Sequence, residues 1–261
     1  MAQKVDILGI MIDNVSKKEL HETIRTSLSQ KRRIKIFTPN PEIVLSASTD
    51  SRSKNILSQA DICVADGVGV IMASRLLGIP LPERIAGIEL GEFLLEYASD
   101  NGLSVCLLGG KKGIAEIAKR KLEAKYPELD ICITHHGFFN VNGKENDDVI
   151  RKINAVAPDI IFVCMGFPRQ EAWICENADK IPSLRLAIGL GGSLDVWSGK
   201  VRRAPRFFRT LSIEWLWRML CEPRRAKILV EIPLFVWKII AQKLSKSHRK
   251  ALKNGENAHK F

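Results

Sequence analysis

The sequence lacks the patterns that mark several common classes of enzyme and membrane protein. It has no D-x-D, C-x-x-C or G-x-S-x-G motif, and "VWSGK" has Leu194 where a P-loop needs its first glycine. No apolar run approaches the ~20 residues that a membrane-spanning helix needs. A hydrolase triad and a P-loop nucleotide site are therefore unsupported.

Cysteine is present but in no pattern of a disulfide or metal scaffold. Of the six cysteines, four lie in strongly apolar runs, namely Cys63, Cys106, Cys132 and Cys164. A reduced thiol behaves there as a small hydrophobic side chain, so we expect a cytoplasmic protein without disulfides. The opening stretch "MAQKVDILGIMIDN" has too short an apolar run for a signal peptide.

Excess negative charge is absent, and the net charge of +11 is unevenly distributed. Residues 200–261 contain 16 Lys and Arg against 4 Asp and Glu, whereas residues 1–199 contain 24 against 25. A basic tail of this kind favours a polyanion: nucleic acid, a phosphorylated substrate or an anionic membrane. We therefore divide the chain into a catalytic part, 1–199, and a basic, amphipathic C-terminal appendage, 200–261.

Short apolar runs alternate with helical patterns along the first part. Ser16 and Glu19 predict a capping box, and Pro41 suits the first turn of a helix. Strands are predicted at residues 5–12, 34–38, 61–65, 103–110, 130–134, 159–166 and 184–192. This alternation predicts an α/β fold, a Rossmann-like and largely parallel sheet with helices on both faces.

Polar and glycine residues cluster where the predicted strands end. In parallel sheets ligands bind beyond the carboxyl ends of the strands, so this edge is the expected site. The residues concerned are Thr38, Asn40, Asp66, Gly109, Gly110, His135, His136, Gly137, Gly166, Arg169, Gln170, Gly191, Gly192 and Asp195.

Asp66, in "ICVADGVGV", has two interpretations. It is either a helix N-cap or a partly desolvated general base, for which Gly67 and Gly69 would clear space for a ligand. Thr38 and Asn40, in "TPNPE", likewise either cap a helix or offer a hydroxyl and an amide to a ligand. Two such strand ends together favour a site.

The turn "LLGGKKG" resembles a phosphate-binding turn, although glycine turns without a ligand are common. It does not fit G-x-G-x-x-G, and the next strand ends in Thr134-His135-His136 rather than an acid, so a nicotinamide enzyme is weakly supported. His135 and His136 lack a third metal ligand at suitable spacing. Arg84 is either a surface ion-pair partner or a diphosphate clamp.

Seven stretches in order, between residues 38 and 225, resemble the WecG/TagA/CpsF family of glycosyltransferases. They are "TPNPEIV", "ADGVGV", "ERIAG", "LLGG", "GFPRQE", "IGLGGSLDVWSG" and "RRAPRFFRTLSIEWLWRMLCEPRR". The TagA type is the most similar. The resemblance implies transfer of N-acetylmannosamine from UDP-ManNAc to undecaprenyl-diphosphate-linked GlcNAc, with inversion and without a metal or other cofactor, in wall teichoic acid synthesis.

The resemblance also implies roles for individual residues. Asp66 would be the general base, and Thr38 and Asn40 would position the substrate. Arg84 would stabilise the leaving diphosphate, and Gln170 matches a family glutamine. Substrate contacts are implied for the glycines at the strand ends and for Asp195, Arg218 and Arg225. The absence of D-x-D agrees with metal independence, because Arg and backbone N–H donors would then carry the leaving charge.

The sequence departs from the family pattern at three places, of which "SLDVW" concerns the donor sugar. Arg169 replaces a common lysine, "SLDVW" replaces a bulkier stretch but keeps Asp195 for uridine, and "HHGFF" has Phe138 where tyrosine is frequent. The exact sugar therefore stays open between UDP-N-acetylmannosamine and its uronic acid.

The tail has two interpretations, a packed pair of helices or a segment lying in the membrane interface. The second fits a lipid-linked acceptor and predicts a peripheral protein on the inner face of the membrane. Trp215, Trp217 and Trp237 beside basic residues would also suit nucleic acid. That alternative leaves Asp66 and Arg84 unexplained, so no nucleic acid is expected. The sequence does not decide whether the protein forms a homo-oligomer.

Overall fold

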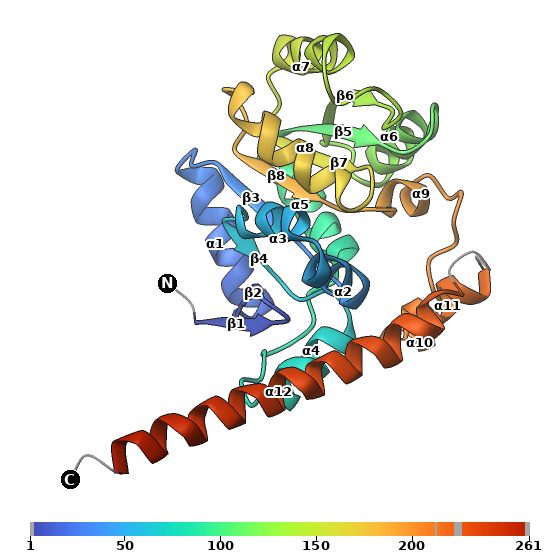
Figure 1. Ribbon diagram of the computed structural model, residues 1–261. Helices are drawn as coiled ribbons and strands as arrows, with labels where there is room; N and C mark the ends of the chain where they lie inside the picture. The colour runs from blue at the N-terminus through green and yellow to red at the C-terminus, as the bar shows by residue number, and fades with distance from the viewer. Residues whose placement is uncertain (1–2, 212, 222–225, 259–261) are drawn as a thin grey trace.

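A parallel sheet of six strands forms the centre of the protein in a computed structural model, which describes residues 3–211, 213–221 and 226–258. The strand order is β4-β3-β8-β7-β5-β6, and helices cover both faces (Figure 1). The strands are β3 (Ile34–Phe37), β4 (Ile62–Cys63), β5 (Ser104–Gly109), β6 (Asp130–His135), β7 (Ile160–Cys164) and β8 (Leu186–Gly189). The predicted α/β class is confirmed.

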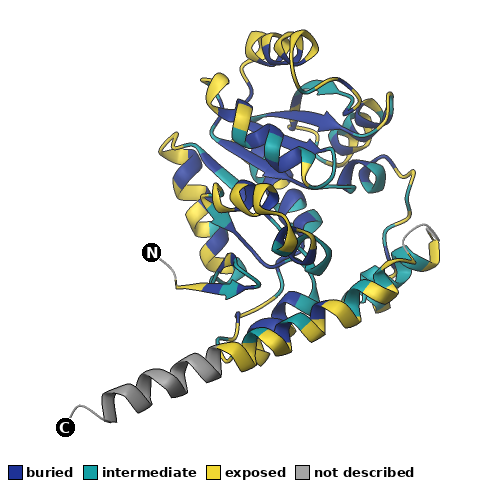
Figure 2. Ribbon diagram, viewed as in Figure 1, coloured by how far each residue is buried: buried dark blue, intermediate teal, exposed yellow. Residues whose placement is uncertain are grey.

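Alternate residues of the central strands enter two different hydrophobic cores. In β7, Ile161 and Val163 face one core, while Ile160 and Phe162 face the other. Helices α2 (Pro41–Thr49), α3 (Ser51–Ser58), α4 (Val68–Leu76), α7 (Lys144–Val156) and α8 (Arg169–Asn177) close the first core. Helices α1 (Lys17–Ser29), α5 (Gly87–Asp100), α6 (Ile114–Lys125) and α9 (Ser193–Trp197) close the second. Burial on both faces explains why the strands are continuous apolar runs (Figure 2).

Two predicted helix starts are confirmed in detail. The Ser16 side chain accepts from the backbone of Glu19, whose carboxylate accepts from the Ser16 N–H, which completes the capping box. Pro41 is the first residue of α2, with Asn40 as the N-cap. All six cysteines are free, and Cys132 is half-buried where a core position was expected.

The single strand predicted at 5–12 is wrong. The chain forms an antiparallel hairpin of β1 (Lys4–Ile7) and β2 (Ile10–Asp13) instead. Leu8 and Gly9 turn between them with φ of 52° and 84°, as tight hairpin turns require. Helix α3 was also not predicted; Asp50 caps it by accepting from the Arg52 and Ser53 N–H groups.

After α9, the described part of the chain continues with the helices α10 (Arg206–Thr210), α11 (Glu214–Cys221) and the long α12 (Ile228–Ala258). Helix α12 crosses the body beside α2 and α4 (Figure 1). One side of it is packed, because Phe235 and Ile239 are only 4% and 1% exposed and Gln242 hydrogen-bonds to the β1–β2 turn. The packed interpretation of the tail is therefore correct for this side. Within the described ranges, no helix is long and apolar enough to span a membrane.

Candidate active site

Asp66 lies just beyond β4, and its half-buried carboxylate faces the start of α5. Its Oδ2 accepts a hydrogen bond from the Gly87 N–H at 3.3 Å. It does not cap α4, whose N-cap is Gly67 and receives no side-chain hydrogen bond. Burial raises the pKa of Asp66 to about 6, opposed by the Gly87 N–H and Arg84. An acid with such a pKa can accept a proton near neutral pH.

Thr38 lies next to this carboxylate. A Cβ atom added at Gly87 would stand 2.9 Å from Thr38 Oγ1 and 3.7 Å from Asp66 Oδ2, so both oxygens border the same narrow space. Thr38 donates to the Gly189 carbonyl at 3.4 Å. The neighbouring Asn40 caps α2 by accepting from the Ile43 N–H through its Oδ1, which leaves its amide NH₂ group available as a donor to a ligand.

The glycines after Asp66 have a packing role that differs from our expectation. A Cβ at Gly69 would lie 2.7 Å from Pro41 Cγ, and one at Gly67 would lie 3.3 Å from Pro41 Cδ. Gly67 also has φ of 94°, which favours glycine. Their small size therefore makes room for the first turn of α2, which brings Asn40 beside Asp66.

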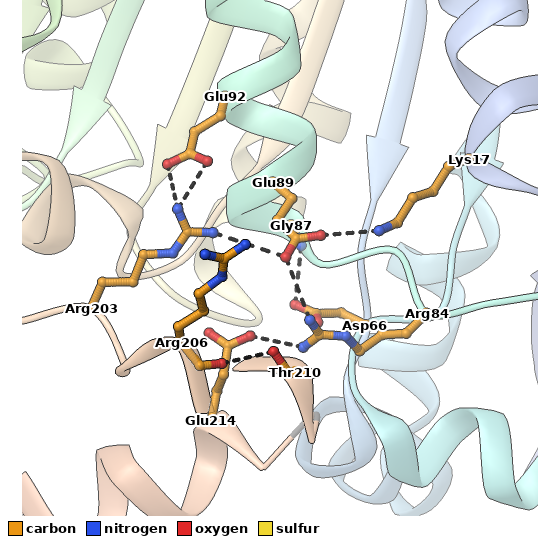
Figure 3. A network of polar contacts seen from close by, with 10 residues as sticks. All are labelled: Lys17, Asp66, Arg84, Gly87, Glu89, Glu92, Arg203, Arg206, Thr210 and Glu214. Carbon is orange, nitrogen blue, oxygen red and sulfur yellow. Dashed lines mark hydrogen bonds and ion pairs between the residues drawn. The ribbon is translucent and has the colours of Figure 1, made fainter. Parts of the chain in front are cut away.

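Arg84 is the centre of a charged network that joins α5 to the C-terminal segment, which starts at residue 200 (Figure 3). Its guanidinium lies 3.0 Å from Glu214 of α11 and 3.6 Å from Glu89 of α5, and its side chain is only 15% exposed. Arg203 extends the network by binding Glu92 at 2.7 Å. The guanidinium lowers the pKa of Asp66, whereas Glu214 raises it, so both charges act on the candidate base.

Arg218 brings a second cation from α11 to the same region. A Cβ at Gly192, just after β8, would lie 3.1 Å from Arg218 Nη2, and this arginine also lowers the pKa of Asp66. The C-terminal segment thus reaches the carboxyl edge of the sheet. Arg225 lies outside the described residues.

Gln170 is 3% exposed and binds protein groups at both ends of its amide. Its Oε1 accepts from the Gly166 and Gly191 N–H groups at 3.1 and 2.9 Å. Its Nε2 donates to Glu171 at 2.8 Å. The side chain therefore ties together the turns after β7 and β8, and in this arrangement both of its polar atoms are occupied.

The glycines after β5 and β6 form a second cluster, which joins three strand ends. A Cβ at Gly109 would stand 2.3 Å from the Cys164 carbonyl oxygen, and one at Gly137 would stand 3.1 Å from the Gly109 Cα. Gly110 donates to Cys164 and accepts from Gly137. This close packing requires residues without side chains. An open cavity of about 350 Å³ adjoins the turn, lined by Lys111, Lys112, His136 and Phe138.

Asp195 and the histidine pair make contacts of their own. Asp195 binds Lys200 at 3.1 Å. His135 Nδ1 is 2.8 Å from the His136 carbonyl oxygen, and burial lowers the pKa of this imidazole. Over the residues that the structure describes, no three His, Cys, Asp or Glu side chains form a group that could hold a metal.

The partners that surround Asp66 and Arg84 were not predictable from the sequence. Glu214 belongs to the family-like stretch "LSIEWLWR", but nothing in the sequence indicates that it binds Arg84, which is 130 residues away. The hydrogen bond from the Gly87 N–H to Asp66 could not be predicted, because the position at which α5 begins was not known from the sequence. Glu171 adjoins Gln170 in "GFPRQE", and nothing in this stretch predicted that a charged side chain there would be buried.

Comparison with known proteins adds to this geometry. Residues 5–249 match the Glycosyl transferase WecG/TagA/CpsF family. Two similar proteins are the N-acetylglucosaminyldiphosphoundecaprenol N-acetyl-beta-D-mannosaminyltransferases of Staphylococcus aureus strains MRSA252 and NCTC 8325 / PS 47. Each is 40% identical over 242 residues, which cover 92% of this chain and 93% of the relative.

Proposed function

Because the chain belongs to the WecG/TagA/CpsF family of glycosyltransferases, we propose that it transfers N-acetylmannosamine from UDP-ManNAc to GlcNAc-diphospho-undecaprenol. The product would carry a β-1,4 linkage and serve wall teichoic acid synthesis. The names of the 40% identical relatives support this acceptor and sugar. The observation that carries the mechanism is the half-buried Asp66, with its pKa of about 6, beside Arg84.

Asp66 acts as the general base in this proposal. Its carboxylate takes the proton of the acceptor hydroxyl as that oxygen attacks the anomeric carbon of the donor. The bond from this carbon to the UDP oxygen breaks, and attack from the opposite side inverts the anomeric centre. A base of pKa about 6 is ionised at pH 7 and still basic enough to assist. Thr38 Oγ1 borders the same space and positions the acceptor.

Arg84 and Arg218 stabilise the diphosphate that leaves. Guanidinium groups match phosphate oxygens in charge and geometry, and a half-buried setting strengthens their effect. Arg84 is preorganised by Glu214 and Glu89, at 3.0 and 3.6 Å. In the proposed reaction no metal ion is needed on the diphosphate.

The nucleotide has two candidate contacts. The cavity at the turn after β5 offers the ring of Phe138, 67% exposed, for stacking on uracil, and is also lined by Lys111 and Lys112. Asp195 can accept from the uridine hydroxyls once its ion pair with Lys200 is broken. Both contacts lie after strand ends, as expected of a nucleotide in a parallel sheet.

Helix α12 brings the enzyme to its lipid acceptor at the inner face of the membrane. Its outward side exposes large apolar side chains, among them Leu229, Val230, Leu234, Trp237, Ile240 and Leu244. An amphipathic helix with such a face and basic neighbours binds anionic membrane surfaces.

A transfer assay tests the proposal directly. The full chain would receive a GlcNAc-diphospho-lipid analogue and a panel of UDP-sugars that includes UDP-ManNAc and its uronic acid. We expect turnover with UDP-ManNAc and a product of inverted anomeric configuration. Preference for the uronic acid would correct the donor, and no transfer from any UDP-sugar would refute the proposal.

A further inference from the structure

Glu171 is a buried acid to which the proposed mechanism gives no role. It lies in the first turn of α8 and is 2% exposed. Its Oε1 accepts from Gln170 Nε2 at 2.8 Å, while its buried Oε2 has no hydrogen-bond partner among the described residues. A buried carboxylate with one unsatisfied oxygen is costly, so some property of the fold must retain it.

The partners of Gln170 fix the orientation of its amide. Two backbone N–H groups, of Gly166 and Gly191, point at one end of the side chain. Because both groups are donors, this end must be the oxygen. The NH₂ end is therefore directed at Glu171, whose Oε1 is its acceptor among the described residues. Without that acceptor, the NH₂ group would be buried and unsatisfied.

The Glu171–Gln170 pair also lies against Gly189, the last residue of β8, whose carbonyl accepts from Thr38. A Cβ at Gly189 would lie 2.7 Å from Gln170 Nε2 and 3.2 Å from Glu171 Oε1. The carbonyl of the same glycine accepts from Thr38, whose hydroxyl borders the space beside Asp66. Glu171 is thus connected through Gln170, Gly189 and Thr38 to the space that Asp66 borders.

The neutral form of Glu171 suits this position. Burial raises the pKa of Glu171 to about 7, against the lowering effect of the Gln170 hydrogen bond and its own backbone N–H. A neutral carboxyl group still accepts from Gln170 through Oε1. The contact therefore needs an acceptor oxygen at this place and not a charge.

We propose that Glu171 is a positioning residue for glycosyl transfer: it locks the Gln170 amide and so holds the Gly166 and Gly191 turns and Gly189 in the arrangement that receives the substrates. The inference rests on the proposed function for its kinetic consequence only. Its structural consequence, ordered turns after β7 and β8, exists without substrate and can be measured separately.

Three variants separate acceptor, charge and general stability. Glu171→Gln keeps an acceptor oxygen without a charge, whereas Glu171→Met keeps the length and removes the acceptor. Asn146→Leu is the control, because Asn146 is 4% exposed and bonds Trp173 and Asn177 of α8, away from both turns. Each variant is followed by amide hydrogen exchange at Gly166 and Gly191, and by donor KM and kcat.

We expect Glu171→Met to exchange both amides about tenfold faster and to raise donor KM about tenfold, as loss of one buried hydrogen bond allows. Glu171→Gln should stay within about threefold of the parent in both readouts. Asn146→Leu should lower the melting temperature and leave the two amides and KM unchanged.

The proposal fails if Glu171→Met leaves both amides protected, or if Asn146→Leu disturbs them equally. It also fails if Glu171→Gln folds but loses the protection of the Gly166 and Gly191 amides. This test can still be made if Glu171→Met does not fold. If the parent transfers no sugar, the proposed function is refuted, and hydrogen exchange still decides the role of Glu171.

Discussion

Glu214 lies 3.0 Å from Arg84, so the first residue of α11 holds the guanidinium that acts on the pKa of Asp66. The two residues are far apart in sequence, and their contact joins the C-terminal segment to the carboxyl edge of the sheet. The same segment supplies Arg218, which lies beside Gly192. The charge state of the candidate base therefore depends on residues from both parts of the chain.

Substitution Asp66→Asn tests the base. The amide keeps the shape and can still meet the Gly87 N–H through its oxygen, but it cannot take a proton. We expect turnover to fall by about 10²–10⁴-fold, the range for loss of a general base. UDP binding, measured by calorimetry, should be unchanged. Turnover near the parent value would remove Asp66 from the mechanism.

The acid limb of the pH–rate profile should reflect the pKa of Asp66. Protonation inactivates a base, so kcat/KM should fall about tenfold per pH unit below about pH 6. Glu214→Gln removes a negative charge that raises this pKa, so the limb should move to lower pH. Arg84 and Arg218, the two cations that lower it, remain in place.

Glu92→Gln is the matched control for Glu214→Gln. Glu92 belongs to the same network through Arg203, but it is not among the groups that shift the pKa of Asp66. Its substitution should leave the limb in place. A limb that moves equally in both variants, or in neither, would contradict the assignment.

Arg84→Ala should lower kcat by roughly 10²–10³-fold, as loss of one group that stabilises developing charge does. Arg203→Ala serves as the comparison, because it removes another arginine of the same network, which binds Glu92 of α5 at 2.7 Å. We expect both variants to lose thermal stability and only Arg84→Ala to lose kcat. Equal kcat in the two variants would make Arg84 structural.

The fold was largely predictable because its strands are buried on both sides. Runs such as residues 160–165 are apolar throughout, and few structures other than a covered parallel strand satisfy them. The hairpin at residues 4–13 was not recognised, because Leu8 continues the apolar run and only Gly9 signals a turn. Helix α3 is short and polar, so its formation depends more on tertiary contacts than on the periodicity of its apolar residues.

The candidate site was predictable as a set of strand ends and not as a network. Asp66 and Thr38 follow neighbouring strands, which places them together in any parallel sheet of this order. Gln170 was expected to meet substrate, yet its polar atoms bind Gly166, Gly191 and Glu171. Such pairings depend on distances of a few ångströms between distant segments, which no local pattern encodes.

Removal of divalent metal should leave transfer intact. After treatment with EDTA and desalting, we expect kcat within about twofold of the untreated enzyme, because the guanidinium groups of Arg84 and Arg218 carry the leaving charge. Loss of activity that Mg²⁺ or Mn²⁺ restores, with no change in the melting temperature, would show that a cation takes part.

Membrane binding is best tested on the outward side of α12. Deleting the tail would also remove Phe235 and Ile239, which belong to a hydrophobic core, so a deletion would confuse binding with folding. Val230 and Trp237 are instead 72% and 64% exposed. The double substitution Val230→Glu/Trp237→Glu should keep the melting temperature.

Binding to vesicles of phosphatidylglycerol and phosphatidylcholine should weaken at least tenfold in this variant, since about 1.5–3 kcal/mol is lost per large apolar side chain kept out of the membrane. Transfer to a water-soluble acceptor analogue should persist, because these residues lie away from Asp66. Val156→Glu, on α7 at the opposite end of the molecule in Figure 1, controls for added charge and should bind as the parent does. If the double variant sediments with vesicles as well as the parent, another surface must bring the enzyme to its lipid.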